Sequence, residues 1–347
     1  MTPDRPAPTP LRLVARALAG AAALLVALAS PAAADPAGPS DFRSEVLAIT
    51  PEVAGVEAEI KGGDSFLELR VAEGRTVEVP GYQDEPYLRF LPDGTVERNR
   101  LSTTTYTNED RDGIVDIPAE ATEATASGAD PEWERVASGG SYAWHDHRVH
   151  WMGKATPPVP RGELVTGQYD PWRVPIVVDG EPVEITGQLR YEESVSPLPW
   201  VALAVVVGAG LVVAGRRAGL RAAAAALLTA SVLGAVTGRA EWAATPDGSG
   251  NPLLWALPAF AVVAAAAAVA LATRPAGVVA ALAAVAALSG WVLFRIQVVL
   301  KPVLPTELPD ALDRASLALG LGASVAVAVL AVTSGAIALP ALDEDDD

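Results

Sequence analysis

Five long apolar blocks fill most of the second half of this chain, and they limit the folds that it can adopt. The blocks cover residues 200–214, 220–237, 253–273, 276–294 and 312–339. An α-helix needs about 20 apolar residues to cross the hydrocarbon core of a bilayer, and these blocks approach or exceed that length. The sequence therefore predicts an α-helical membrane domain of about five spans over residues 199–339.

Arginine placement predicts how these spans are oriented. The connections after the first and third blocks carry the basic residues Arg216, Arg217, Arg221 and Arg274. Arginine favours cytoplasmic loops, so both connections are expected inside the cell. An odd number of spans then places residues 35–198 outside the cytoplasm and the acidic tail, residues 340–347, inside. Four tryptophans fall at the outer interface in this arrangement: Trp200, Trp242, Trp255 and Trp291.

The interiors of the spans are expected to hold no ionisable side chain, and this bears on function. Ionisable residues inside a bilayer are costly and usually mark a path for ions or protons. Arg295 and Lys301 follow the fourth block and are expected to reach water at the outer surface, which the proline-containing segment 301–309 is expected to cap. These features favour a helix bundle that anchors the exported domain or binds another membrane protein over an ion transporter.

The first 34 residues have the composition of a secretory signal peptide. Arg5, Arg12 and Arg16 flank or precede a short apolar run over residues 17–29, and three alanines precede Asp35. The run is shorter than a membrane span, so we expect cleavage before Asp35 rather than an uncleaved anchor.

The part that is expected to be exported carries the whole net negative charge of the chain. The formal net charge is −17, and residues 35–199 contain 14 Lys and Arg against 31 Asp and Glu. Such a region repels nucleic acid and anionic lipid surfaces, so nucleic acid is not expected as a partner. The chain has no cysteine, which excludes disulfide bonds and thiolate metal sites.

Short apolar runs separated by turn residues predict strands in the exported part. Examples are residues 65–71, 76–80, 86–90 and 174–180, with Gly and Asp-Gly turns between such runs. The expected fold of residues 35–198 is therefore an all-β, sandwich-like extracytoplasmic domain.

Two stretches of this domain lack a strand pattern. Residues 118–130 are rich in Ala, Glu and Thr and are expected to be a solvated connection. Residues 101–113 resemble a calcium loop in composition, but their acids do not follow the spacing of such a loop, so a solvated turn is expected there.

All three histidines of the chain, and its only methionine after Met1, lie in one short stretch. Aromatic and β-branched neighbours predict a strand there, in which His145 and His147 share one face while His150 and Met152 share the other. Two imidazoles on one face provide half of a metal site. A bulge near Arg148 could bring His150 to the same side.

A complete metal site would need further donors. A carboxylate could come from Asp84, Glu85 or Asp110. Imidazole with thioether favours copper, whereas imidazole with carboxylate favours zinc. The tentative metal ligands are His145, His147, His150 and Met152.

Two other interpretations of the same stretch stay open, and the first is favoured. In the first, the histidines belong to a structural network in which Asp146 and Arg148 form an ion pair. In the second, the stretch and the neighbouring 81–90 segment form a surface for a ligand or partner. That surface would comprise Tyr82, Tyr87, Arg89, Trp144, Asp146 and Arg148.

No catalytic motif stands out along the chain. We find no Ser/His/Asp elbow, phosphate-binding loop or paired-carboxylate motif. The sequence therefore predicts that the protein is not an enzyme.

The motifs GYxxEPYLRFxPDGTVxxN, from residue 81, and YAWHDHRxHWM, from residue 142, lie between a signal peptide and Ala-rich spans. This arrangement resembles an uncharacterised family of membrane proteins from high-GC Gram-positive bacteria, to which no activity is attached. It is more loosely similar to bacterial envelope copper-handling proteins, which join a small β-sandwich to membrane spans. That likeness implies copper as the metal.

These features together predict a non-catalytic, multi-pass envelope protein whose exported β-domain acts through binding or scaffolding. The expected partners are the lipid bilayer and another envelope or membrane protein. The alternative is extracytoplasmic copper binding or handling through residues 145–152.

Overall fold

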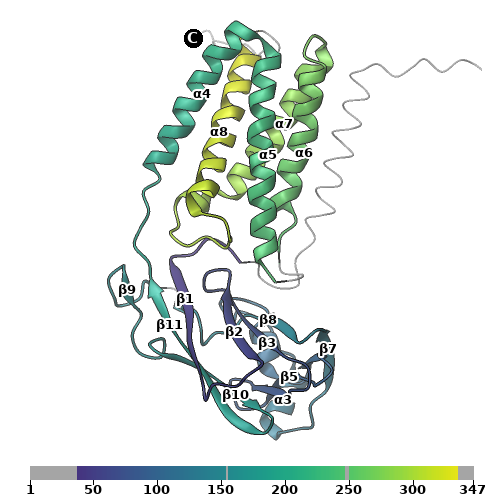
Figure 1. Cartoon of the computed structure of the whole chain (residues 1–347), viewed down its shortest axis with the longest axis vertical. Helices are drawn as coiled ribbons and strands as arrows, with labels where there is room; N and C mark the ends of the chain where they lie inside the picture. Colours follow the sequence, from purple (N-terminus) through teal and green to yellow (C-terminus); the bar gives the residue numbers. More distant parts are fainter. Residues whose placement is uncertain (1–36, 154, 247–249, 335–347) are drawn as a thin grey trace, which may run out of the picture.

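The computed structural model describes residues 37–153, 155–246 and 250–334, which form a sheet domain joined to a bundle of helices (Figure 1). The predicted signal peptide and the acidic tail lie outside the described residues. The sheet domain covers residues 42–191 and precedes the helices, as the sequence predicts.

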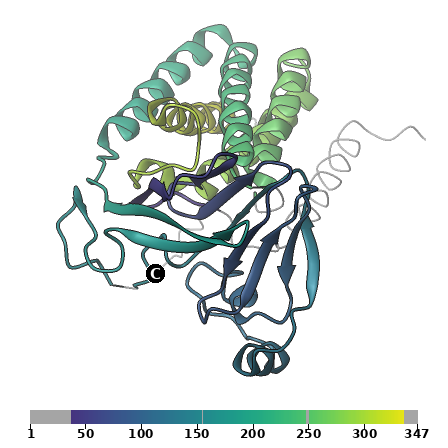
Figure 2. The same ribbon diagram turned by 60° about the horizontal axis from the view of Figure 1, so that its bottom comes forward.

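The sheet domain contains two antiparallel sheets, which Figure 2 shows side by side below the bundle. The larger sheet has β9 (Glu163–Leu164) paired with β11, and its other strands lie in the order β1 (Phe42–Thr50), β11 (Glu181–Tyr191), β10 (Trp172–Val178), β4 (Val77–Pro80), β5 (Pro86–Phe90), β6 (Val96–Asn99) and β7 (Trp133–Ala137). The smaller sheet consists of β2 (Val56–Lys61), β3 (Phe66–Val71) and β8 (Ser141–Trp144). The four predicted strand runs coincide with β3, β4, β5 and β10.

Alternating burial along the strands explains why these segments pair as sheets. In β10 every second side chain from Trp172 to Val178 is buried, and β11 alternates in the same way. The core between the sheets includes Leu67, Leu69 and Phe90. Removing each of these side chains from water contributes about 1.5–3 kcal/mol.

Two short helices interrupt the strands where irregular segments were predicted. One of them is solvated, as predicted, and the other is buried, so the prediction of a solvated turn was wrong there. Helix α3 (Ala119–Ser127) occupies the predicted solvated connection, because its Ala and Glu residues favour helix, and it buries only Ala121. Helix α2 (Thr103–Thr107) occupies the predicted solvated turn, and Thr103, Thr104 and Thr105 are buried in it. Their hydroxyls compensate for burial by hydrogen bonding within the domain.

Among the described residues, five helices are long and apolar enough to cross a membrane, which confirms the predicted number. They are α4 (Leu198–Ala218), α5 (Leu220–Ala244), α6 (Leu253–Ala270), α7 (Pro275–Phe294) and α8 (Asp310–Thr333). Glycine lets α4 and α8 approach closely, since a Cβ on Gly322 would lie 2.7 Å from the carbonyl oxygen of Ala204. Small residues at helix contacts are the usual packing device in membranes.

One tryptophan differs from its predicted place at the membrane interface. Trp291 is fully buried in the bundle, and its indole nitrogen donates to the carbonyl of Leu254 at 2.8 Å. It joins α7 to α6, whereas Trp255 is more than one third exposed.

The segment after α7 connects the bundle to the sheet domain. A short 3-10 helix, η1 (Ile296–Val299), leads into residues 301–304. Val303 and Ser40 exchange two backbone hydrogen bonds, and the Lys301 ammonium lies 2.5 Å from the Asp41 carboxylate. Gly63 faces the same segment, and a Cβ there would overlap the Val303 side chain. The segment predicted to cap the bundle thus also holds the sheet domain.

Candidate functional site

The three histidines meet in a turn rather than along a strand, which corrects the prediction for this stretch. Strand β8 ends at Trp144, and the chain then reverses. The ring centroids of His147 and His150 are 5.3 Å apart, and those of His145 and His150 are 6.4 Å apart. The predicted separation of His145 and His147 from His150 on opposite faces is therefore wrong.

Asp146 causes the turn. Its carboxylate accepts from the backbone N–H of Arg148 at 3.1 Å, and its carbonyl accepts from the backbone N–H of Val149 at 3.0 Å. An Asp side chain that bonds its own backbone two residues on competes with strand pairing and favours a turn. The turn preference of Asp146 is visible in the sequence, but the aromatic neighbours led to the prediction of a strand.

The same carboxylate forms the ion pair that the structural-network interpretation expects. Asp146 is fully buried and accepts from Arg148 Nε at 2.8 Å, from Arg148 Nη2 at 2.6 Å and from Trp144 Nε1 at 2.9 Å. Burial alone would raise the pKa of Asp146, but the charge and hydrogen bonds of Arg148 outweigh it and the pKa is lowered. A two-bond guanidinium–carboxylate pair fixes the direction as well as the position of Arg148.

The imidazoles of His147 and His150 are held in their neutral form. Burial lowers the pKa of His147 and, together with the positive charge of Arg111, lowers the pKa of His150 to about 3. His147 Nε2 donates to the backbone oxygen of Asp110 at 3.0 Å. His145 is buried with its ring against Phe66, at a centroid distance of 4.2 Å. Neutral imidazole is the form that binds metals.

The hydrogen bonding of the His150 ring is incomplete. It is completely buried, and its Nδ1 lies 3.3 Å from the backbone oxygen of Trp151. Within the described part of the chain, its Nε2 has no hydrogen-bond partner. A buried ring nitrogen without a partner is unusual in a purely structural network.

A hollow of about 650 Å³ opens beside this turn, and we call it the histidine hollow. Four of the predicted site residues line it, with additional residues from β10 and the loop before it: Tyr82, His147, Arg148, Met152, Gly167, Gln168, Asp170, Pro171 and Arg173. Its volume is within the range of small-molecule sites. Residues predicted for a metal and residues predicted for a ligand surface thus share one wall.

Tyr82 organises this wall. Its hydroxyl donates to Asn108 Oδ1 at 2.5 Å and accepts from the backbone N–H of His147 at 2.8 Å. The His147 ring stacks on it at a centroid distance of 5.7 Å, and the Arg148 guanidinium lies 5.2 Å from its ring centroid. Burial raises the pKa of Tyr82 well above its ordinary value, so its hydroxyl keeps its proton.

The other predicted surface residues lie away from the hollow. Tyr87 and Trp144 are buried in the core of the sheet domain, where Tyr87 accepts from Asn108 Nδ2 at 3.1 Å. Arg89 pairs with Glu97 and lies over the Trp133 ring at 4.2 Å. Neither Tyr87 nor Arg89 lines the hollow.

None of the predicted carboxylate donors joins the imidazoles. Glu85 accepts from Ser102 and Thr104, and the Asp110 carboxylate accepts from the backbone N–H groups of Asp112 and Ile114. The described residues contain no group of three or more His, Asp or Glu placed to hold a metal ion.

Asp64 and Arg111 beside the histidines were missed from the sequence. Asp64 is fully buried, and its Oδ2 lies 2.5 Å from Arg111 Nη2. Burial raises the pKa of Asp64 although Arg111 opposes it. These residues are 47 positions apart, so no local pattern connects them.

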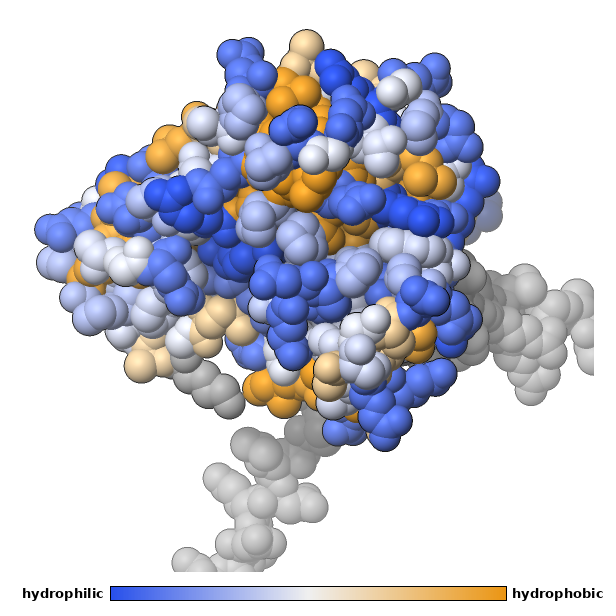
Figure 3. All heavy atoms as spheres, turned by 90° about the horizontal axis from the view of Figure 1, so that it is seen from below, coloured by the Kyte–Doolittle hydropathy of each residue, from blue (hydrophilic) through white to orange (hydrophobic). Residues whose placement is uncertain are grey.

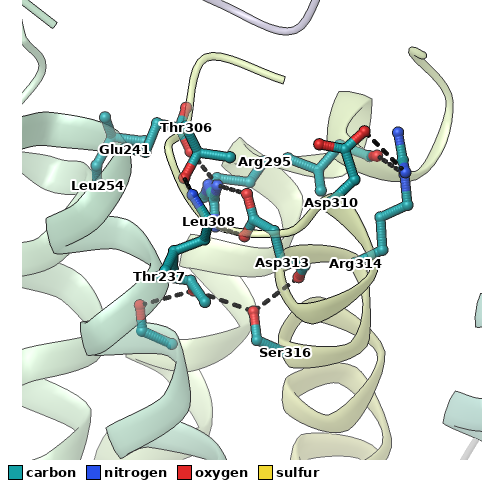
Figure 4. Close-up of polar contacts among 12 residues, drawn as sticks. Thr237, Glu241, Leu254, Arg295, Thr306, Leu308, Asp310, Asp313, Arg314 and Ser316 are labelled. Carbon is teal, nitrogen blue, oxygen red and sulfur yellow. Dashed lines mark hydrogen bonds and ion pairs between the residues drawn. The ribbon is translucent and has the colours of Figure 1, made fainter. Parts of the chain in front are cut away.

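A second polar cluster lies inside the bundle, at the end that faces the sheet domain (Figure 4). Arg295 binds both carboxylate oxygens of Asp313, at 3.0 and 2.8 Å, and also pairs with Glu241. The three side chains are at most 4% exposed. The expectation of spans without ionisable side chains, with Arg295 in water, is therefore wrong.

The sequence carried a signal for this cluster. Asp313 lies inside the predicted fifth span, and Glu241 lies in α5 because this helix extends seven residues beyond the predicted end at Thr237. An acid within an apolar block needs a partner of opposite charge. Residues 222–238 of α5 and 315–333 of α8 contain no ionisable side chain, so the cluster does not continue across the bundle.

Arg314, next to Asp313, fixes the connection to the sheet domain. Its guanidinium donates to the carbonyls of Val298, Lys301 and Pro302 at 3.0 to 3.1 Å. The first turns of α8 therefore contact both the buried ion pairs and residues 298–302, which lead to the contact with the sheet domain.

Comparison with known proteins gives no match: no family model, curated protein or solved structure is significantly similar to this chain.

Proposed function

We propose that this chain is a non-catalytic membrane protein that binds a ligand or partner of the cell envelope in the histidine hollow. The observation that carries this proposal is the wall formed by Tyr82, His147 and Arg148. Each of these side chains is fixed by a hydrogen bond or ion pair within the domain, and binding sites gain affinity from such preorganisation.

The character of the wall narrows the ligand class. The ring of Tyr82, the neutral imidazole of His147 and the Met152 side chain provide apolar and aromatic contact. Asp170 adds a negative charge, and Arg173, which pairs with Glu184, adds an exposed guanidinium. Arg148 is neutralised by Asp146. A ligand or side chain with an aromatic or aliphatic body and a polar tip fits these surroundings.

We place the sheet domain outside the cytoplasm in this proposal. The arginines of the helix connections lie at the end of the bundle away from the sheet domain (Figure 1), and arginine favours the cytoplasmic side. The surface of the sheet domain that faces away from the bundle is mainly hydrophilic (Figure 3), as suits a domain surrounded by water. The helices serve as its anchor.

The hollow can be tested by filling it in the full-length protein. Gln168 is exposed on its wall, so Gln168→Trp fills the hollow without disturbing the core. Envelope extract is passed over immobilised wild type, Gln168→Trp and the control Arg89→Ala, and retained species are identified by mass spectrometry. A species retained by wild type and Arg89→Ala but lost from Gln168→Trp is expected. Equal retention by all three proteins would overturn the proposal.

A copper site is the second candidate, and the convergence of the three imidazoles favours it. His147 and His150 have neutral rings, and His150 Nε2 lacks a hydrogen-bond partner in the described structure. Because no three His, Asp or Glu of the described residues are placed to hold a metal as they stand, the three rings would have to turn toward one another around the ion, with Met152 as a further donor. Titration of the full-length protein with Cu(I) and Cu(II) tests this idea. Weak binding that His145→Ala and His150→Ala leave unchanged would remove it.

A further inference from the structure

A pocket lies between four helices at the end of the bundle away from the sheet domain. Its volume is about 500 Å³, and it opens between α4, α5, α7 and α8. The interior is mainly apolar, with side chains such as Leu220, Leu282, Val327 and Leu330. We call it the far-end pocket.

One arginine lines this pocket, and three others lie on neighbouring helix ends. Arg216 lines it directly, while Arg217, Arg221 and Arg274 lie on the same helix ends, and all four side chains are exposed. Gly219 allows this concentration, because its positive φ of 79° joins α4 to α5 without a longer loop.

Among the described residues, these arginines have no anionic partner. Of the ion pairs between described residues, none involves any of the four, although most arginines of the sheet domain pair with a carboxylate. No carboxylate of the described residues therefore compensates their positive charge at the edge of this apolar cavity.

We propose that the far-end pocket binds one anionic phospholipid, with an acyl chain between the helices and its phosphate on Arg216 and the neighbouring arginines. An apolar cavity that opens at the level of the headgroups excludes water and accepts a hydrocarbon chain. The planar guanidinium binds phosphate through two parallel hydrogen bonds, and basic pockets between helices at a membrane surface select anionic headgroups. This site is independent of the histidine hollow and of its ligand.

The net charge of the headgroup should determine which phospholipid binds. A zwitterionic lipid offers the same hydrocarbon and a phosphate, but it also carries a cation that the arginines repel. Each basic residue near the membrane surface strengthens anionic binding about fivefold. The acidic residues 343–347 could compete with the lipid phosphate for the same arginines. Deleting these residues distinguishes the two anions.

Native mass spectrometry of the full-length protein in detergent tests the site, with phosphatidylglycerol, phosphatidylcholine and inorganic phosphate as probes. We expect one phosphatidylglycerol to be retained more strongly than phosphatidylcholine. The double variant Arg216→Gln, Arg217→Gln should bind phosphatidylglycerol about 25-fold more weakly, at about fivefold for each arginine. The matched control is Arg239→Gln, an exposed arginine at the other end of α5, which should leave it unchanged.

A pocket-filling variant tests the acyl chain. Val278→Trp enters the pocket from a half-buried position on α7 and should reduce phosphatidylglycerol retention while all arginines remain. Equal retention of both lipids, equal effects of the Arg216/Arg217 and Arg239 variants, or equally strong binding of inorganic phosphate would each overturn the proposal. Phosphatidylglycerol binding that appears only after residues 343–347 are deleted would assign the arginines to the tail and overturn it as well.

Discussion

Arg295 and Asp313 form a buried ion pair in which two guanidinium nitrogens meet two carboxylate oxygens at 3.0 and 2.8 Å. The pair joins the end of α7 to the first turn of α8, and Glu241 adds α5 to the same guanidinium. Three helices therefore share one cation. Since the buried charges of the described helices lie only at the end next to the sheet domain, the geometry suits an anchor more than a path for protons.

Replacing Arg295 by Met should destabilise the bundle strongly. The substitution leaves two carboxylates buried without a cation, and breaking a buried pair from one side costs about 3–5 kcal/mol. Thermal unfolding of the full-length protein in detergent measures the loss. Arg239→Gln removes an exposed arginine and should change stability by less than about 0.5 kcal/mol.

The variant with Leu, Met and Leu at positions 241, 295 and 313 separates charge burial from packing. Well-packed apolar replacements of a buried ionic cluster are often neutral or stabilising. The triple variant should therefore unfold above Arg295→Met. If it unfolds at the same temperature, the cluster contributes through its shape rather than through the pairing of its charges.

Gly63 should prove essential for seating the sheet domain on the bundle. Gly63→Ala requires a side chain at φ 82° and also places a Cβ into Val303. Gly74→Ala is the matched control, because Gly74 has a φ of 87° and no neighbouring atom within 4 Å of the added Cβ. The first variant should lose about 1–3 kcal/mol more than the second, since the overlap adds to the backbone cost.

Hydrogen exchange locates this effect. Faster exchange over residues 296–304 in Gly63→Ala, but not in Gly74→Ala, is expected. Unchanged exchange in that segment would show that Val303 adjusts without loosening the contact.

Local patterns in the sequence predicted the large elements but not the contacts between distant ones. Apolar length predicted the five helices, and alternation predicted strands such as β10, because both signals lie within one element. The pairing of Arg295 with Glu241 spans 54 residues, so it depends on how the helices pack. The histidine turn was missed for a different reason: the Asp146 side chain bonds its own backbone more favourably than a continued strand would.

The buried His150 should make the sheet domain sensitive to acid. Its pKa is about 3 in the folded protein against an ordinary value of 6.5, so below pH 6.5 the unfolded chain binds a proton that the folded protein does not. Stability should therefore fall as pH decreases from about 6.5 toward 3, by about 1.4 kcal/mol per pH unit for this residue. Above pH 6.5 the imidazole is neutral in both states, so the stability of the sheet domain no longer depends on pH through His150.

Comparison with His150→Phe isolates this residue from the carboxylates that also titrate in acid. Unfolding of both full-length proteins is followed between pH 7 and pH 4. Wild type should lose more stability than His150→Phe as the pH falls from 7 to 4. Parallel curves would show that His150 takes up its proton in the folded protein.

Asp146→Asn should disturb both the stability of the sheet domain and the histidine hollow. The substitution leaves the Arg148 guanidinium without its buried counter-ion, and about 3–5 kcal/mol of stability should be lost. Glu97→Gln removes the partner of Arg89 in a partly exposed pair, so about 1 kcal/mol or less is expected there. Thermal unfolding compares the two, and similar losses would mean that the Asp146 pair has no special role.

The orientation of the chain can be tested directly, because the chain contains no cysteine. Gln168→Cys places a thiol on the exposed wall of the histidine hollow, and Thr273→Cys places one in the exposed α6–α7 connection at the far end of the bundle. A membrane-impermeant maleimide added to intact cells should label Gln168→Cys, while Thr273→Cys should react only after the membrane is permeabilised. The unaltered chain serves as the background control. The reverse labelling pattern would place the hollow in the cytoplasm, where an envelope ligand could not reach it.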